Sequence, residues 1–283
     1  MRLLLIIAVF LFNLQAKSLF SNDEQKQSSH FIGSLKELLI STQKTRGLTN
    51  SYLNGNTATL LLVYGNRDDM KRAIGKMEST TLAADPVINA RMQNISNALL
   101  KLNHRALKQK AKKTFSEYTE EIQEILMFAQ TVSQRSSKDL TPFGKESSQI
   151  MIMTLLPLTE AIGQLRGFGS GLASKKTLSK SDIEQIYLLV HQATTLDETL
   201  QEQMSGLSSK YSSKLPSSIH TELSSVEKKI QAYSSLASKK LIKTPKDIDP
   251  DIFFEEGTSI ISAIIKLYNS TNYAVLEDAK GWL

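Results

Sequence analysis

Apolar residues recur at a helical spacing from Phe31 almost to the end of this chain, and this periodicity constrains the fold more than any other feature. Interruptions are few, because the 283 residues include only 6 prolines and 13 glycines. Aromatic residues make up 7% of the chain, whereas strands favour aromatic and β-branched side chains. The pattern therefore predicts an all-α fold without strands of useful length.

Turn and helix-stop signals divide the periodic stretch into about eight helical segments. The segments span roughly residues 24–54, 57–80, 85–109, 111–137, 144–174, 180–208, 216–239 and 250–279. Pro157 falls inside the fifth segment, so that helix should kink or divide there. Long helices with short connections favour two up-and-down four-helix bundles, with halves at about 31–140 and 141–283. Long helices shared between two stacked bundles are the alternative arrangement.

The two halves resemble each other at a constant offset of 120 residues. The identical pairs are Leu35 and Leu155, Leu38 and Leu158, Arg46 and Arg166, and Gly47 and Gly167. In both copies, apolar or small residues occupy successive positions of a heptad, which is the spacing that bundle packing needs. This similarity indicates that the helices around the two arginines have equivalent places in the two halves.

The first residues have the pattern of a secretory signal peptide. Arg2 precedes an apolar stretch at residues 3–12, and Ala16 provides a small residue for cleavage. Ten helical residues reach about 15 Å, half of the ~30 Å hydrocarbon layer, which favours a cleavable signal over a membrane anchor. We therefore expect a signal peptide at 1–16, a polar leader at 17–30, a helical domain at 31–283 and a periplasmic location.

Several classes of function lack support in the sequence. The absence of cysteine excludes disulfides, thiolate metal sites and cysteine nucleophiles. The four histidines are scattered without metal-binding spacing, and no catalytic or phosphate-cradling motif is present. The net charge of +6 is small for a chain of this length. The basic run at residues 104–113 lacks the interleaved aromatic residues of a nucleic-acid-binding surface. We expect no enzyme activity, metal, cofactor or nucleic-acid partner.

Two arginines are the strongest candidates for binding. Arg46 and Arg166 each lie one position beyond the apolar seam of their helix, so both should be at least partly buried. A buried guanidinium needs a partner, and its planar fork of donors matches a planar oxyanion. The candidate ligand-binding residues are Arg46, Arg166, Thr42, Thr49, Asn50 and Ser170. The alternative is that each arginine pairs with a bundle glutamate, with Glu120, Glu121, Glu124, Glu198 and Glu202 available.

Three motifs resemble those of nitrate- and nitrite-sensing (NIT) domains. Residues 43–49 resemble the first arginine motif of the family, with Thr45 in place of an acidic residue. Residues 156–167 are similar to a second arginine helix, and residues 249–258 resemble the start of a last helix, with Phe253 or Phe254 for a tryptophan. The resemblance implies two four-helix bundles and an anion site at Arg46 and Arg166.

These observations lead to two hypotheses for function. The first is a periplasmic sensor protein that binds a small oxyanion, with nitrate or nitrite favoured. It would signal through a partner such as a membrane sensor kinase or chemoreceptor, and a homodimer is compatible with this role. The second is a helical adaptor that has no small ligand and binds a membrane receptor or another protein.

Overall fold

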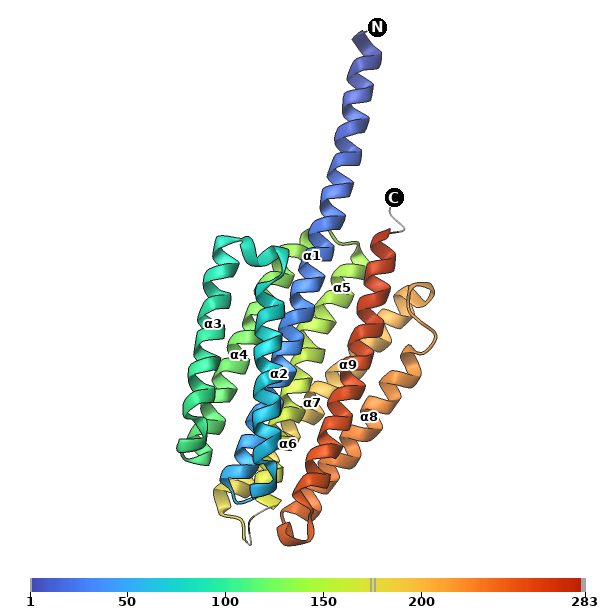
Figure 1. Ribbon diagram of the computed structural model, residues 1–283. Helices are drawn as coiled ribbons and strands as arrows, with labels where there is room; N and C mark the ends of the chain where they lie inside the picture. The colour runs from blue at the N-terminus through green and yellow to red at the C-terminus, as the bar shows by residue number, and fades with distance from the viewer. Residues whose placement is uncertain (1, 174, 176, 281–283) are drawn as a thin grey trace.

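The computed structural model describes residues 2–173, 175 and 177–280, with side chains described from Gln25 onward except at position 139. Regular structure in these ranges is entirely helical, which confirms the all-α class (Figure 1). The first half contains α1 (Arg2–Leu53), α2 (Leu60–Glu78), α3 (Pro86–Arg105) and α4 (Ala111–Ser136). The second half contains α5 (Pro142–Ile150), α6 (Leu156–Ala173), α7 (Lys180–Tyr211), α8 (Ile219–Ser235) and α9 (Pro250–Lys280).

Shorter helical turns connect these elements or extend their ends. The 3₁₀ turns are η1 (Thr57–Thr59), η2 (Thr81–Ala84), η3 (Ala106–Lys108), η4 (Ser137–Asp139), η6 (Ser212–Lys214) and η8 (Pro245–Asp247). Two segments are π-helical, η5 (Met151–Leu155) and η7 (Leu236–Leu241). Apart from the start of α1, the observed helices follow the segments expected from the periodicity to within a few residues at each end.

The helices pack as two groups that lie side by side (Figure 1). In the first group α1 contacts α2 and α4, and α3 completes the group against α2 and α4. In the second group, α6 contacts α7 and α9, and α8 packs on α7 and on α9. Helices α1 and α6 also pack extensively on each other, so these two helices join the groups. Most buried apolar residues of both halves form one continuous cluster, from Phe31 to Val275, and Leu48, Val63 and Phe254 form a second, small one.

Helix starts follow local sequence signals. Asp85 caps α3 because its carboxylate accepts hydrogen bonds from the backbone N–H of Val87 and of Ile88, and Pro86 occupies the first helical position, where no N–H is needed. Ser179 and Asp182 bond reciprocally as a capping box at the start of α7. These interactions fix where each helix enters its group.

The predicted interruption at Pro157 is confirmed. The chain from Pro142 to Ala173 is helical throughout but passes through the π segment Met151–Leu155 just before the proline. Proline has no N–H, and its ring clashes with the carbonyl group one turn earlier in an α-helix. In the wider π turn the N–H of Leu156 donates to the carbonyl of Met151. The helix therefore divides into α5 and α6 without a loop.

The N-terminal part of the chain differs from the expected polar leader. Helix α1 is continuous through residues 17–30, because this polar stretch contains neither proline nor glycine to stop a helix. The predicted signal peptide at residues 1–16 lies outside the described side chains, and its cleavage stays a prediction. Among the described residues, no helix has the length and apolar character that membrane crossing requires.

Candidate functional site

The two arginine motifs meet where α1 crosses α6. The helices approach so closely that a Cβ atom added at Gly167 would lie 2.8 Å from the Cα atom of Gly47. Only glycine at these two positions allows such contact between helix backbones. Arg46 and Arg166 directly precede these glycines, and each lies about two turns before the end of its helix. Gly47 and Gly167, which the 120-residue offset matches, are thus neighbours in space.

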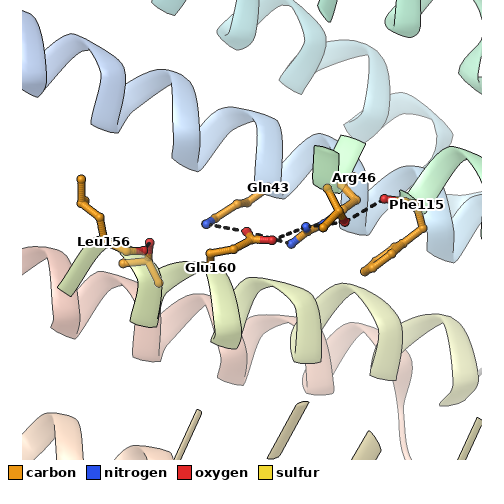
Figure 2. Close-up of polar contacts among 7 residues, drawn as sticks. Gln43, Arg46, Phe115, Leu156 and Glu160 are labelled. Atoms are coloured by element: carbon orange, nitrogen blue, oxygen red, sulfur yellow. Dashed lines mark hydrogen bonds and ion pairs between the residues drawn. The ribbon is translucent and has the colours of Figure 1, made fainter. Parts of the chain in front are cut away.

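Arg46 is bound by a carboxylate within the protein. Its Nη1 donates to Oε1 of Glu160 at 2.5 Å, and its Nη2 donates to Oε2 at 3.2 Å (Figure 2). Gln43 donates to the same Oε2 at 2.9 Å. Arg46 is 0% exposed and Glu160 3% exposed. The pair has the bidentate geometry that makes arginine–carboxylate interactions strong and specific.

Helix α4 covers the other side of the Arg46 guanidinium. The Cζ atom of Arg46 lies 4.8 Å from the centre of the Phe115 ring, which is within the range of a cation–π contact. Nη1 also donates to the hydroxyl of Thr119 at 2.9 Å. Phe115 and Thr119 line a groove of about 450 Å³ between α4, α6 and α7. An adjoining groove of about 420 Å³ reaches Glu160, so the ion pair lies directly beneath this surface.

Arg166 has a different environment. It is 1% exposed and lies between α6 and the start of α9, with its Cζ atom 4.5 Å from the centre of the Phe254 ring. Nη1 donates to the hydroxyl of Thr258 at 3.0 Å. Nε and Nη2 are buried and have no hydrogen-bond partner. No carboxylate among the described residues forms an ion pair with Arg166, so its charge is buried without a counter-ion.

The space around Arg166 depends on a glycine and a tyrosine. A Cβ atom added at Gly257 would lie 2.8 Å from Cβ and Cγ of Arg166 and 2.9 Å from the hydroxyl oxygen of Tyr233. Gly257 therefore leaves room for the arginine to extend along α9. The Tyr233 hydroxyl donates to the carbonyl of Phe253 at 3.0 Å. Burial raises the pKa of Tyr233 well above its ordinary value, so this hydroxyl stays neutral.

Burial lowers the pKa of Arg166 to about 10, far below that of an exposed arginine. The positive charge of Arg46 acts to lower this pKa further, and the carboxylates of Glu160 and Glu255 act to raise it. The guanidinium is nevertheless protonated at neutral pH. A buried cation with two nitrogen atoms that lack acceptors favours an anion, because an anion would supply both the missing charge and the missing hydrogen-bond acceptors.

The other candidate residues bond mainly to the helix backbone. The Thr42 hydroxyl donates to the carbonyl of Leu38 at 2.7 Å. Asn50 and Ser170 both donate to the carbonyl of Gly167, at 2.8 and 3.4 Å. The Thr49 hydroxyl oxygen is buried without a hydrogen-bond partner. Asn50 therefore stabilises the crossing of α1 and α6, whereas the Ser170 bond lies within α6.

Sequence reasoning missed the carboxylate that pairs with Arg46. The proposed glutamates lie in α4 and α7, whereas Glu160 lies in α6 itself. A signal was present, because Glu160, Gly163 and Gly167 follow a spacing of three and four residues along one helix face. The two glycines mark the face that α1 approaches most closely. A glutamate on that face is well placed to meet the arginine of the other helix.

Sequence reasoning also missed Gln43, Phe115 and Thr119 as contacts of Arg46, and Tyr233 as a neighbour of Arg166. Phe254 and Thr258 were recognised in a motif, but not as contacts of Arg166. The described residues contain no group of three or more His, Asp or Glu side chains placed to hold a metal ion. The polar groups that the fold brings together here are suited to holding an anion.

The comparisons with known proteins agree with this description. The model of a family described as nitrate and nitrite sensing matches residues 37–273. Among solved structures, the chain is similar to the NasR transcription antiterminator, with a TM-score of 0.73 and 13% sequence identity. The similarity covers 97% of this chain and 74% of that chain, and at this identity it shows the fold alone. No match was found among curated proteins.

Proposed function

This chain belongs to the nitrate- and nitrite-sensing family. On that premise we propose that it binds a small oxyanion, with nitrate or nitrite favoured, at the buried guanidinium of Arg166. In this proposal the anion accepts hydrogen bonds from Nε and Nη2 of Arg166. Arg46 contributes a second positive charge from the neighbouring helix. The protein acts as a sensor and has no catalytic step of its own.

One observation carries the proposal. Arg166 is completely buried, and neither Nε nor Nη2 has a partner. Burying a cation without a counter-ion costs several kcal/mol, which an anion bound next to it would recover. Arg46 differs, because Glu160 pairs with its charge and both Nη atoms are bonded, so that only its Nε is buried without a partner. The two arginines therefore contribute differently to the proposed site.

The remaining candidate residues position the site in this proposal. Asn50 bonds from α1 to the carbonyl of Gly167, next to Arg166, and so holds α1 against α6, whereas Ser170 bonds to the same carbonyl from within α6. Thr42 is fixed to its own helix, and the buried hydroxyl of Thr49 can accept or donate one further bond after a rearrangement. Joint binding of one anion by Arg46 and Arg166 requires Glu160 to release Arg46.

We also propose that the protein works in the periplasm and signals through a partner, such as a membrane sensor kinase or chemoreceptor. The location rests on the signal-peptide pattern of residues 1–16. In this proposal the protein has two conformations, and an anion shifts the equilibrium between them only if it binds one more tightly than the other. Helix α1 is suited to pass on such a shift, since it carries Arg46 and contacts α2, α4 and α6.

Thermal unfolding of the purified protein in different anions tests the binding proposal. Nitrate, nitrite, chloride, sulfate and short carboxylates are compared at matched ionic strength. An anion present at about 100 times its Kd adds about 2.7 kcal/mol to the free energy of unfolding, a shift of several degrees in Tm. We expect nitrate or nitrite to raise the Tm of the wild type and to leave that of Arg166→Met unchanged.

Arg72→Gln is the control, because it removes an exposed arginine that pairs with Asp69 on the surface. This variant should respond to anions as the wild type does. A Tm that rises equally in the wild type, R166M and R72Q reports general salt effects and contradicts the proposal. No selective response at all would favour the helical adaptor, for which the Arg46–Glu160 ion pair is the expected kind of structural contact.

A further inference from the structure

The carboxylate of Glu160 occupies the donor fork of Arg46 in the way an external oxyanion would. Two parallel hydrogen bonds, at 2.5 and 3.2 Å, join it to Nη1 and Nη2. Gln43 donates a third bond to the same carboxylate at 2.9 Å. Figure 2 shows Gln43 and Arg46 pointing from α1 towards Glu160 on the facing helix. The protein thus supplies one anion from its own chain.

The charges at this crossing determine what charge an anion bound beside Arg166 can carry. Arg46 and Arg166 together contribute two positive charges, and Glu160 contributes one negative charge. The buried region therefore lacks one negative charge. A monovalent anion beside Arg166 completes the balance, whereas a divalent anion would leave an uncompensated negative charge away from water, which is unfavourable.

We infer that Glu160 is a specificity-determining residue, an internal counter-ion that holds Arg46 and restricts the site to monovalent oxyanions. This inference rests on the proposed anion site at Arg166. It adds that the charge of the ligand is selected by a residue that need not contact the ligand. Removing the charge of Glu160 frees the Arg46 fork and leaves the crossing short of two negative charges.

Isothermal titration calorimetry with nitrate and with sulfate tests the inference on the full chain at matched ionic strength. The wild type should bind nitrate at least tenfold more tightly than sulfate. Glu160→Gln keeps the size of the side chain and removes its charge. We expect E160Q to bind nitrate at least tenfold more tightly than the wild type and to lose most of the preference against sulfate.

Glu222→Gln is the matched control. Glu222 is also a buried glutamate, with an ion pair to Lys266 at 3.5 Å. It lies about 16 Å along α8 from Tyr233, which puts it far from Arg166. E222Q should keep the affinities of the wild type. Wild-type affinities in E160Q, or a folded E160Q that binds neither anion, would overturn the inference while leaving nitrate binding by the wild type intact.

A second variant keeps the two proposals separable. Glu160→Ala removes the whole carboxylate and opens a space beside Arg46 that a formate ion fits. We expect formate to raise the Tm of E160A by several degrees more than that of the wild type, and this gain to disappear when Arg46→Met is added. A wild type that binds no anion would reject the proposed function, whereas an E160A that gains nothing from formate would reject the role of Glu160.

Discussion

At the scale of single residues, Arg46 and Arg166 show how equivalent positions can acquire different energetics. Both precede a glycine at the same helix crossing, and both are almost completely buried. Their positions could be predicted because helix periodicity places each beside an apolar seam. Their partners could not, because the choice of Glu160 over a glutamate of α4 or α7 depends on how the helices rotate against one another.

This difference predicts that replacing each arginine by methionine changes the free energy of unfolding differently. Arg46→Met leaves Glu160 buried without its counter-ion, so the free energy of unfolding should fall by about 3–5 kcal/mol. Arg166→Met removes a charge that has no counter-ion and keeps a similar side-chain volume, so stability should stay within about 1 kcal/mol of the wild type or rise. Urea unfolding followed by circular dichroism, in buffer without oxyanions, measures both. A loss in R166M as large as that in R46M would show that Arg166 is a structural residue.

At the scale of elements, the helices were predicted well from the sequence because their signals are local. Helix α1 ends just before Gly55, and helices α3 and α5 start at Pro86 and Pro142. Glycine and proline act in this way whatever the rest of the fold does. The π segment before Pro157 has the same local origin. Helix α1 extends through the polar residues 17–30, where only the lack of apolar periodicity had indicated a leader. Polarity alone does not stop a helix.

The crossing of α1 and α6 gives a test at this scale. Gly167→Ala places a methyl group 2.8 Å from the Cα atom of Gly47, so the backbones must separate, and we expect a loss of about 1–3 kcal/mol in stability. Gly206→Ala, inside α7, has no atom within 4 Å of the added Cβ and should gain about 0.5–1 kcal/mol from its higher helix propensity. Chemical denaturation of the two variants measures the contrast. Equal effects would mean that α1 and α6 do not require this contact.

At the scale of the whole molecule, the two halves share one apolar core. The sequence predicted two sets of four helices but left open how they join, because the answer depends on one close contact between distant glycines. In the structure the groups lie side by side through α1 and α6 (Figure 1). The predicted boundary near residue 140 therefore separates two groups that bury a large face against each other.

We therefore expect neither half to fold on its own. The fragments 31–140 and 141–283 would each expose the apolar face that joins α1 to α6, and each should bind a hydrophobic dye and unfold without a sharp transition. Mixing or co-expressing them should restore cooperative unfolding. Circular dichroism and dye fluorescence provide the measurements. Sharp, independent unfolding of either fragment would instead define it as a separate domain.

On the proposed function, the uncompensated charge of Arg166 would also affect how long a molecule survives. Proteases cut chains mainly through their transiently opened forms, so a ligand that stabilises the closed form slows degradation. If an anion binds at Arg166 as proposed, the protein should therefore be digested more slowly where that anion is abundant. The amount of this protein, and not only its conformation, would then follow the supply of the anion that it senses.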